Sequence, residues 1–424
     1  MEKTIIKSHR INEEYIKVKH QSGLTILLYP MKGFNTAYAL FGTKYGSIDN
    51  TFKTDSDDDF VTVPDGIAHF LEHKLFESED GDAFTLFAKT GANANAFTSF
   101  DKTCYLFSCT DNFEESLKSL VKFVQAPYFT EQTVQKEQGI IGQEIRMYED
   151  LPSWRVLFNV LEGLYVNNPV KVDIAGTVES IAKIDAELLY RCYNTFYNLS
   201  NMVISVAGNF DADVALKIIE EGLKDSKPVT IERKGYDEPY KANKKEVTQK
   251  LDVAIPLFYF GYKINPCENP YENLCQQIQL EILLDILAGP TSDFYNDMYE
   301  KGLLNSNFGI EVFGGRGFLS ALFGGESKDP RSVLDAFNKM VKSKVLSEDD
   351  FLSCRNALYG KALKGMNDAE DTATAMLTYE MMDVGLFDMT EVIANTTFED
   401  VKKRFETDFN EECQSLSIIF PNDR

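Results

Sequence analysis

The second half of this chain repeats the first, and this duplication limits the folds that the chain can adopt. Residues 181–206 align without a gap to residues 393–418, at an offset of 212. Nearer the start of each half, Gly91 meets Gly302 at an offset of 211. Two related domains of roughly 200 residues each are therefore expected, which is a normal domain size. The identities in the long alignment are Ile181/Ile393, Ala182/Ala394, Glu187/Glu399, Thr195/Thr407, Asn198/Asn410 and Ser205/Ser417.

The boundary between the two halves is expected at residues 226–246, where charge and proline replace periodic hydrophobicity. This linker separates an N-terminal domain, residues 1–225, from a C-terminal domain, residues 247–424. Of the 424 residues, 44% are hydrophobic and 26% are charged, which is enough apolar material for two sizeable cores.

Each half has the pattern of an α+β domain. Hairpin-like strands with helices packed on one face indicate a mostly antiparallel sheet, whose other face is free to line a cavity. Alternating or continuous apolar residues predict strands at residues 23–29, 36–45, 103–109 and 202–207. Helical periodicity predicts helices at residues 83–90, 112–124, 130–149 and 186–197.

Residues 69–73 read His-Phe-Leu-Glu-His and contain two of the four histidines in the chain. The preceding Pro-Asp-Gly, residues 64–66, supplies a turn and an N-cap, so a helix is expected over residues 67–76. His69 and His73 then lie one turn apart on one face, with Glu72 beside them. Two neutral imidazoles at this spacing can hold Zn²⁺, and the carboxylate can take a proton from metal-bound water. The alternative is a pair of surface histidines on an amphipathic helix.

A catalytic zinc site needs a third protein ligand, usually a carboxylate. Glu137 and Glu144 are seven residues apart in the predicted helix at residues 130–149, so they share a face. Two such glutamates on their own usually belong to a solvated face. Downstream of His-x-x-Glu-His, they become candidates for the missing ligand.

Together these motifs resemble those of a known family. His-x-x-Glu-His followed by Glu-x6-Glu is the pattern of the inverzincins, the pitrilysin/insulinase-type zinc peptidases. The resemblance covers essentially the whole chain and is greatest for the bacterial processing-protease-like branch. It rests on residues 65–73, 91–98, 137–152, 176–181 and 201–202.

The resemblance implies a role for each residue of the motifs. His69, His73 and Glu144 are expected to bind one Zn²⁺ per chain, and Glu72 is expected to act as the general base. Glu137 is expected to serve catalysis as a carboxylate that supports the zinc site from outside the ligand set.

The resemblance also implies a substrate site and an arrangement of the two domains. An edge strand that matches Asn95, Ala96, Phe97 and Thr98 binds substrate in this family by adding it to a sheet. That role is physically sensible, because an unpaired edge offers backbone donors and acceptors to any extended peptide. The two α+β domains are expected to face each other like a clamshell around the zinc.

The second half has lost the metal ligands. At an offset of 211, His69, Glu72 and His73 fall on leucines, and Glu144 falls on an arginine. Leucine cannot bind a metal ion, so a single zinc site is expected in the N-terminal domain. The matching residues are Leu280, Leu283, Leu284 and Arg355.

One departure from the family pattern concerns the second half. Active members commonly carry an Arg and a Tyr there that contact the substrate carbonyl near the zinc, whereas this chain has Tyr299 and Asn305 at or near those positions. An oxyanion donor of this kind is typically worth about 10²–10³ in rate. Arg316 is a possible substitute, although a plain loop arginine is the simpler interpretation.

The formal net charge of −23 has two interpretations. It can serve solubility, or it can reflect an acidic cavity that favours basic peptides. No basic patch interleaved with aromatic residues is present, so nucleic acid is not an expected partner.

The chain is expected to be cytoplasmic. Its seven cysteines are scattered and form no Cys-x-x-Cys pair, which is typical of reduced thiols. Residues 1–23 contain no apolar stretch like that of a secretory signal, and no window of eighteen uninterrupted apolar residues suggests a membrane span.

Two functions fit these observations. The first is a zinc endopeptidase that cleaves peptides or unfolded segments captured by strand addition in a cavity between the domains. It is expected to act as a heterodimer with a metal-less homologous chain, or as a homodimer. The second is a non-proteolytic subunit that binds a peptide or a partner and keeps a structural or vestigial zinc site. Glu72 favours the first, because a structural site needs no general base.

Overall fold

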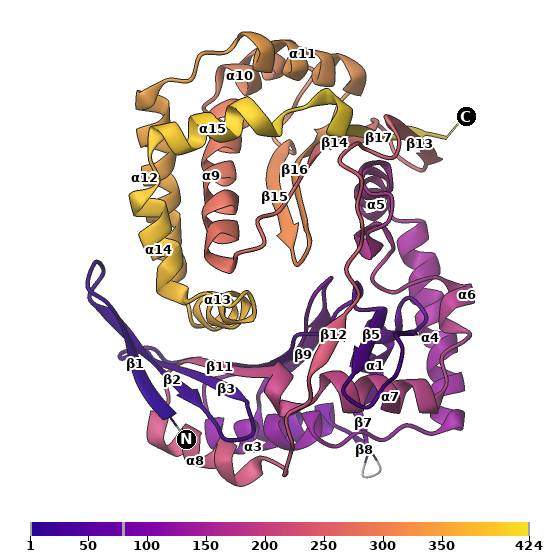
Figure 1. Ribbon diagram of the computed structural model, residues 1–424, viewed down its shortest axis with the longest axis vertical. Helices are drawn as coiled ribbons and strands as arrows, with labels where there is room; N and C mark the ends of the chain where they lie inside the picture. The colour runs from indigo at the N-terminus through magenta and orange to yellow at the C-terminus, as the bar shows by residue number, and fades with distance from the viewer. Residues whose placement is uncertain (1, 79–80, 423–424) are drawn as a thin grey trace. The chain divides into compact units, whose positions relative to one another are not determined.

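The computed structural model describes residues 2–78 and 81–422. They form two compact units, which are both discontinuous in sequence (Figure 1). The first unit contains the residues up to Ile145, together with Asp173–Lys234 and Leu363–Phe387. The second contains Arg146–Val172, Gly235–Ala362 and the residues from Asp388 onward.

The first unit is built on a seven-stranded sheet. All neighbouring strands are antiparallel except β3 and β11, which are parallel. The sheet order is β1 (Glu2–Ser8), β2 (Glu13–Lys19), β3 (Thr25–Pro30), β11 (Met202–Gly208), β4 (Ala37–Thr43), β10 (Thr103–Cys109) and β9 (Asn93–Thr98). Smaller sheets contain β12 (Ile231–Arg233), β5 (Thr51–Thr54) and β6 (Val61–Thr62), and β7 (Glu77–Ser78) and β8 (Gly81–Asp82).

The helices of the first unit include every predicted helix, so the α+β prediction is confirmed for this half. The four predicted strands are β3, β4, β10 and β11. The helices are α1 (Ile67–Leu75), α2 (Phe84–Thr90), α3 (Phe113–Val124), α4 (Glu131–Glu149), α6 (Val178–Ile181), α7 (Ala186–Phe196), η2 (Leu199–Asn201), α8 (Ala212–Gly222) and α13 (Ala369–Met381).

The second unit has a five-stranded sheet, antiparallel except for the parallel pair β13 and β17. Its order is β13 (Glu246–Leu251), β17 (Gln414–Pro421), β14 (Leu257–Ile264), β16 (Phe318–Glu326) and β15 (Gly309–Gly315). Its helices are α5 (Pro152–Leu164), η1 (Pro169–Lys171), α9 (Pro270–Ala288), α10 (Asp293–Glu300), α11 (Pro330–Ser343), α12 (Glu348–Gly365), α14 (Leu386–Asn395), α15 (Phe398–Asp408) and η3 (Glu411–Cys413).

The strand pairings show the duplication directly. The last strand of each half, β11 or β17, lies between a parallel and an antiparallel neighbour. In each sheet two more antiparallel strands follow on the antiparallel side, β10 and β9 in the first and β16 and β15 in the second. Starting from the aligned pair Ser205 and Ser417, three steps across each sheet match residues 95–98 of β9 with residues 309–312 of β15. The steps are Ser205–Leu40, Leu40–Leu106 and Leu106–Asn95 in the first unit, and Ser417–Tyr259, Tyr259–Gly324 and Gly324–Gly309 in the second.

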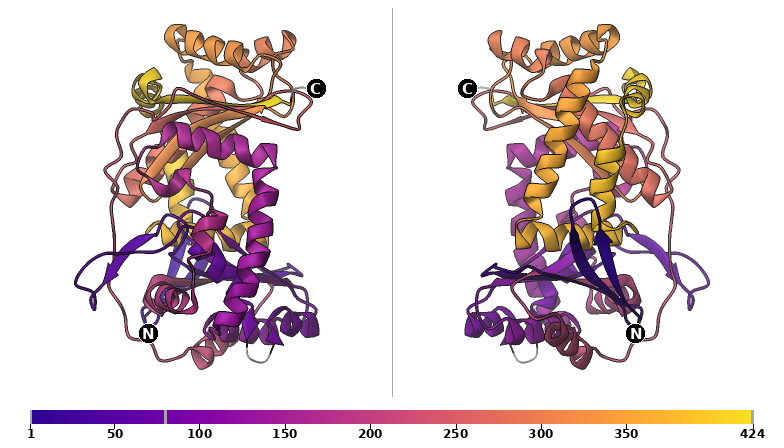
Figure 2. Two further views of the ribbon diagram at one scale, coloured as in Figure 1. Left: turned by 90° about the vertical axis from the view of Figure 1, so that its right-hand side faces the viewer. Right: turned by 90° about the vertical axis from the view of Figure 1, so that its left-hand side faces the viewer.

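The central strands of the first unit are covered on both faces. Every residue of β4 and β11 is buried, so both faces need apolar neighbours. One face packs on α3 and α8, and the other packs on α13 (Figures 1 and 2). Ser205 Oγ donates a hydrogen bond of 2.8 Å to the Ala373 carbonyl of α13. A Cβ at position 42 would lie 2.8 Å from Met381 Cε, so Gly42 permits this close packing. The prediction of helices on one face therefore omitted α13.

The second unit is covered in the same way. On one face, Phe337 of α11 packs against Phe260 and Phe323, with ring centroids 5.2 and 4.5 Å apart. On the other face, α5 packs on β14 and β17. Because α5 comes from the first half of the sequence and α13 from the second, the two halves exchange helices. The domain boundary expected at residues 226–246 stays a prediction. Each compact unit contains segments from both sides of it.

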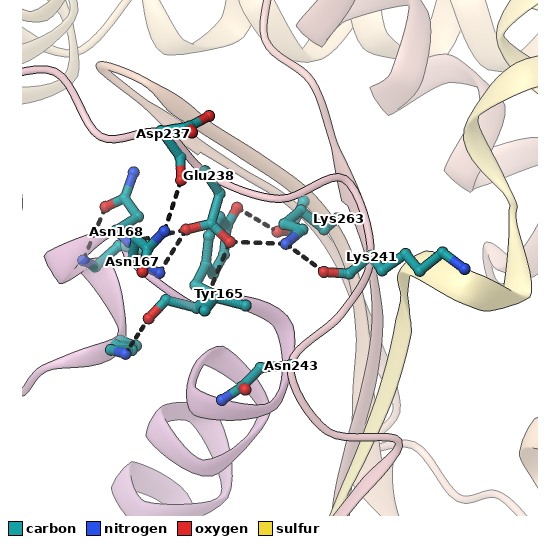
Figure 3. Close-up of polar contacts among 12 residues, drawn as sticks. Tyr165, Asn167, Asn168, Asp237, Glu238, Lys241, Asn243 and Lys263 are labelled. Atoms are coloured by element: carbon teal, nitrogen blue, oxygen red, sulfur yellow. Dashed lines mark hydrogen bonds and ion pairs between the residues drawn. The ribbon is translucent and has the colours of Figure 1, made fainter.

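The predicted linker is an ordered part of the structure. Its β12 pairs with β5, and farther along Glu238 accepts hydrogen bonds from three consecutive backbone N–H groups (Figure 3). The donors are Val166, Asn167 and Asn168, at 2.8, 2.7 and 2.8 Å. Lys263 Nζ adds an ion pair of 2.7 Å to the same carboxylate. These contacts attach the end of the linker to the second unit.

The seven cysteines are all free, and five of them are buried. The structure thus agrees with the expectation of reduced thiols. Among the helices of the described residues, none combines the length and the apolar character that a membrane span requires.

Candidate metal centre

Helix α1 can begin where it does because of Gly66. This N-cap residue has a φ of 89°, and a Cβ there would lie 2.3 Å from the Ala175 carbonyl oxygen, so only glycine fits. Gly66 has no side chain to cap the helix, and the neighbouring Asp65 accepts a hydrogen bond of 2.9 Å from Asn50 Nδ2. The turn that sequence predicted is therefore present, with glycine as its essential residue.

The apolar face of α1 fixes the direction of the motif. Because the spacing of 69, 72 and 73 is that of one helical face, His69, Glu72 and His73 project together from the side that the core leaves free. The buried apolar residues of the helix are Ile67, Ala68, Phe70, Leu71 and Leu75.

Glu144 of α4 approaches both histidines. His69 Nε2 lies 3.8 Å from Glu144 Oε1, and His73 Nε2 lies 3.5 Å from Glu144 Oε2. One ligand atom from each residue lies within 4.8 Å of the others. In the part of the chain that the structure describes, this is the one group of three or more His, Cys, Asp or Glu side chains with such a spacing.

The three residues fit a zinc ion. Ligand atoms about 2.1 Å from a tetrahedral zinc are roughly 3.4 Å apart, close to the two nitrogen–oxygen distances across Glu144. Imidazole and carboxylate are also the ligand types of catalytic zinc sites. The side chains of His69, His73 and Glu144 remain 12%, 26% and 21% exposed, so the centre lies at an accessible surface of the first unit.

Glu137 orients one of the histidines. Its Oε1 lies 3.0 Å from His73 Nδ1, and its side chain is only 7% exposed. A hydrogen bond to Nδ1 fixes the ring and leaves Nε2 directed at Glu144, as is usual for metal-binding histidines. By contrast, His69 Nδ1 is buried and has no hydrogen-bond partner among the described residues, so packing holds that ring.

Glu72 is held by a residue of another element. The Thr98 hydroxyl of β9 donates a hydrogen bond of 2.7 Å to Glu72 Oε2. Sequence reasoning placed Thr98 only in the substrate strand, because no local pattern reveals that a strand end meets a helix more than twenty residues away. The contact joins the predicted base to the predicted substrate strand.

The pKa values of the two histidines are shifted in opposite directions. Burial, reinforced by the charge of His73, lowers the pKa of His69 to about 3, so this imidazole is neutral at pH 7. Burial also acts to lower the pKa of His73, but the hydrogen bond to Glu137 and the charges of Glu72 and Glu144 raise it above its usual value. Burial raises the pKa of Glu72, against the opposing effect of Thr98.

The strand expected to bind substrate lies beside the centre. Residues 95–98 belong to β9, the last strand of its sheet, which pairs with β10 on one side. Helix α1 packs against β9. The described residues leave the other edge of β9 unpaired within this sheet, as strand addition requires.

The second unit contains the positions where the family pattern departs. Tyr299, at the expected Arg position, is exposed. Asn305, at or near the expected Tyr position, donates a hydrogen bond of 2.8 Å to Glu326. Arg316 follows the end of β15, in the turn to β16.

The leucines that replace the ligands are core residues. Leu280, Leu283 and Leu284 of α9 are at most 1% exposed. Arg355, in the place of Glu144, donates to the Thr396 carbonyl at 3.2 Å. This part of the second unit therefore offers no counterpart of the metal ligands.

Comparison with known proteins assigns the family. The family model described as "Insulinase (Peptidase family M16)" matches residues 63–178, and the model described as "Peptidase M16 inactive domain" matches residues 183–358. The "Uncharacterized zinc protease YmfH" of Bacillus subtilis is 40% identical over 423 residues, which cover 98% of this chain and 99% of that protein.

Two further comparisons agree. The crystal structure of an M16-like peptidase from Alicyclobacillus acidocaldarius has a TM-score of 0.93 and 33% identity, covering 100% of this chain and 99% of that one. A protein from Arabidopsis thaliana named "Probable mitochondrial-processing peptidase subunit beta, mitochondrial" is 27% identical over 46% of this chain and 38% of its own length. From its motif, its fold and these relatives, the chain belongs to peptidase family M16, the insulinase family of zinc proteases.

Proposed function

We propose that this chain is a zinc-dependent endopeptidase acting on peptides or unfolded segments. The observation that carries the proposal is the His-His-Glu donor set, with Glu72 held beside it by Thr98. His69, His73 and Glu144 would hold one Zn²⁺ per chain. The seven free cysteines favour a reducing compartment, the cytoplasm.

Each residue then has a separate task. Zinc, when bound, would supply a water of lowered pKa and would polarise the scissile carbonyl. Glu72 would take a proton from the attacking water and return it to the leaving amine. Glu137 would fix the ring of His73, and Thr98 would hold the Glu72 carboxylate in place.

Substrate would be captured by its backbone. An extended segment would pair with residues 95–98 of β9. This pairing would bring a peptide bond close to Glu72, because Thr98 contacts that carboxylate. Backbone pairing tolerates many side chains, so sequence preference would be broad.

We also propose that a homologous chain completes the site. Tyr299 and Asn305 stand at or near the positions where active members have Arg and Tyr, and one missing oxyanion donor reduces rates by about 10²–10³. A metal-less partner that carries such an Arg and Tyr would restore the rate. The plant relative bears the name of a peptidase subunit, which supports assembly as a mode of action for similar chains.

The same departure favours a second candidate function. Without an oxyanion donor, the chain could bind peptides or a partner and keep its zinc site for structure. Asn305 supports this alternative, because its side chain is already engaged by Glu326. The presence of Glu72 argues against it, since a structural zinc site needs no base.

The test is cleavage of an unfolded protein by the zinc-loaded chain, alone and mixed with metal-less homologues of its source organism. The proposal expects weak cleavage alone, an increase of orders of magnitude with the right partner, and loss of cleavage in Glu72→Gln with zinc retained. Equal cleavage by the wild-type and Glu72→Gln proteins, or none with any partner, would contradict it. Rapid cleavage by the isolated wild-type chain would leave the enzyme assignment intact but remove the partner.

A further inference from the structure

The second unit contains a cavity that the zinc site does not use. It has a volume of about 480 Å³, which is within the range of ligand-binding pockets. Helices α9 and α12 and strand β15 form its walls, so it lies wholly within the second unit. The lining residues are Glu281, Ile282, Leu284, Asp285, Pro290, Ile310, Glu311, Val312, Cys354, Ala357, Leu358 and Lys361.

This cavity is the counterpart of the zinc site in the duplicated half. Residues 310–312 of β15 correspond, by the register of the two sheets, to residues 96–98 of β9. Leu284 of α9 aligns with His73, and α12 contains Arg355, which aligns with Glu144. The second half has therefore replaced the metal ligands, and a cavity lies between the elements that correspond to α1, α4 and β9.

The lining has an apolar part and a negative part. Eight of the twelve residues are apolar, and the remaining four are Glu281, Asp285, Glu311 and Lys361. Lys361 forms an ion pair of 3.9 Å with Glu281 at an exposed end of the cavity, where the two side chains are 81% and 47% exposed. One lysine thus faces three carboxylates, and the lining as a whole stays negative. Burial raises the pKa of both Glu281 and Glu311, so each carboxylate gains from an added positive charge.

A lysine or arginine side chain has the matching chemistry. Its methylene stem suits apolar walls, and its charged head suits carboxylates. A phosphate or a free carboxylate would be repelled by three acidic groups, and a purely apolar group would leave their charge offset only by Lys361.

The neighbouring strand indicates that the occupant is part of a polypeptide. Within the described residues, β15 pairs with β16 alone and ends its sheet. An extended chain that pairs with β15 sends alternate side chains to one face of the sheet. Ile310, Glu311 and Val312 belong both to this edge strand and to the cavity wall.

We propose that this cavity binds a lysine or arginine side chain of a polypeptide that lies along β15. The inference rests on the proposed function, and it deepens that function by naming polypeptides with basic residues as the preferred substrates. It also gives the excess negative charge of the chain a local role, in addition to solubility.

The test measures binding and not cleavage, so its outcome is separable from that of the proposed function. The full-length Glu72→Gln protein, loaded with zinc, is titrated with a fluorescent unstructured peptide containing one lysine. The same peptide with norleucine or acetyl-lysine in that place retains the stem and removes the charge. Fluorescence anisotropy is expected to show about fivefold weaker binding of both uncharged peptides.

Variants locate the effect in the cavity. Glu281→Gln/Glu311→Gln is expected to bind the three peptides equally, whereas Glu268→Gln, an exposed change in the same unit outside the cavity, is expected to keep the preference for lysine. Melting temperatures of the variants confirm that they are folded. Equal affinity of the parent protein for the lysine and norleucine peptides would overturn the proposal, as would a preference that survives the double substitution.

The source of the cation is tested with lysine amide as a competitor. The proposal expects it to compete only at concentrations far above the dissociation constant of the peptide. Competition by lysine amide at concentrations similar to that constant would show that a free amine is the occupant, and the polypeptide assignment would then be wrong.

Discussion

The Thr98 hydroxyl lies 2.7 Å from Glu72 Oε2, so strand β9 holds the carboxylate that projects from helix α1. Thr103 Oγ1 in turn lies 3.3 Å from Thr98 Oγ1 and donates to the Tyr45 carbonyl at 2.9 Å. The position of the proposed base is therefore fixed by two neighbouring strands and does not depend on α1 alone.

Thr98→Val should lower kcat about tenfold or more, because it removes a hydrogen bond to a charged group. KM and bound zinc should change little, since the valine has nearly the same shape. Thr98→Ser keeps the hydroxyl and should recover most of the activity. Steady-state kinetics with the partner present, together with zinc analysis, checks this. A valine variant with normal kcat, or a serine variant as slow as valine, would show that Thr98 does not position Glu72.

Zinc retention should separate ligands from the base. His73→Ala and Glu144→Gln should lose most of their zinc after passage over a desalting column with chelator, because each removes one of three protein ligands. Glu72→Gln should retain one zinc per chain. Full zinc content in both ligand variants, measured by mass spectrometry of the metal, would refute the assignment.

Glu137→Gln should give an intermediate result. Its amide can still contact His73 Nδ1 but carries no charge, so zinc affinity should fall by about 10- to 100-fold. Competition against a fluorescent zinc chelator measures this. An affinity equal to that of the wild type would mean that the 3.0 Å contact with His73 has no part in metal binding.

Proline substitutions should reveal substrate pairing along β9. Successive N–H groups of an edge strand point to opposite sides, one toward β10 and the next toward the open edge. Of Ala96→Pro and Phe97→Pro, one should therefore disrupt the sheet and the other should fold, retain zinc and bind unfolded peptides poorly. Circular dichroism identifies the folded variant, and normal peptide binding by that variant would rule out capture at this strand.

The contacts of Glu238 should make stability depend on pH. Burial acts to raise its pKa, but Lys263 and the three backbone N–H groups lower it below the usual value. Such a group stabilises the fold fully above its unfolded pKa, and the contribution is lost as the pH falls through the folded pKa.

Glu238→Gln should therefore cost about 2 kcal/mol at pH 7, because the buried Lys263 loses its charged partner. The difference from the wild type should shrink in acid. Urea unfolding at several pH values measures it, with Glu268→Gln as the control. A difference that stays constant from pH 7 to below the folded pKa would contradict this account.

Sequence predicted the regular elements well because their signals are local. Residues 103–109 and 202–208 are runs of strand-forming residues. His69 and His73 are four residues apart, so the short motif alone indicates that both lie on one face of a helix. Glu144 could be paired with those histidines only through family resemblance, since no local pattern brings α4 beside α1.

Other features depend on tertiary structure and left no local trace. Nothing in residues 369–381 shows that this helix covers a sheet from the other half of the chain. The cavity beside Leu284 was also hidden, because the sequence there predicts an ordinary core helix. The polarity of residues 226–246 predicted a linker. One of its polar residues, Glu238, instead serves the fold by accepting hydrogen bonds from three backbone N–H groups.

The exchange of α5 and α13 has a consequence for synthesis of the chain on the ribosome. When the first repeat has emerged, β4 and β11 are complete, but the helix that covers their second face lies in residues 369–381 and has not yet been made. The N-terminal domain must therefore wait, with an apolar sheet surface exposed, until nearly the whole polypeptide has been translated. Expressed alone, the first repeat should aggregate, and adding a fragment that contains α13 should return it to solution.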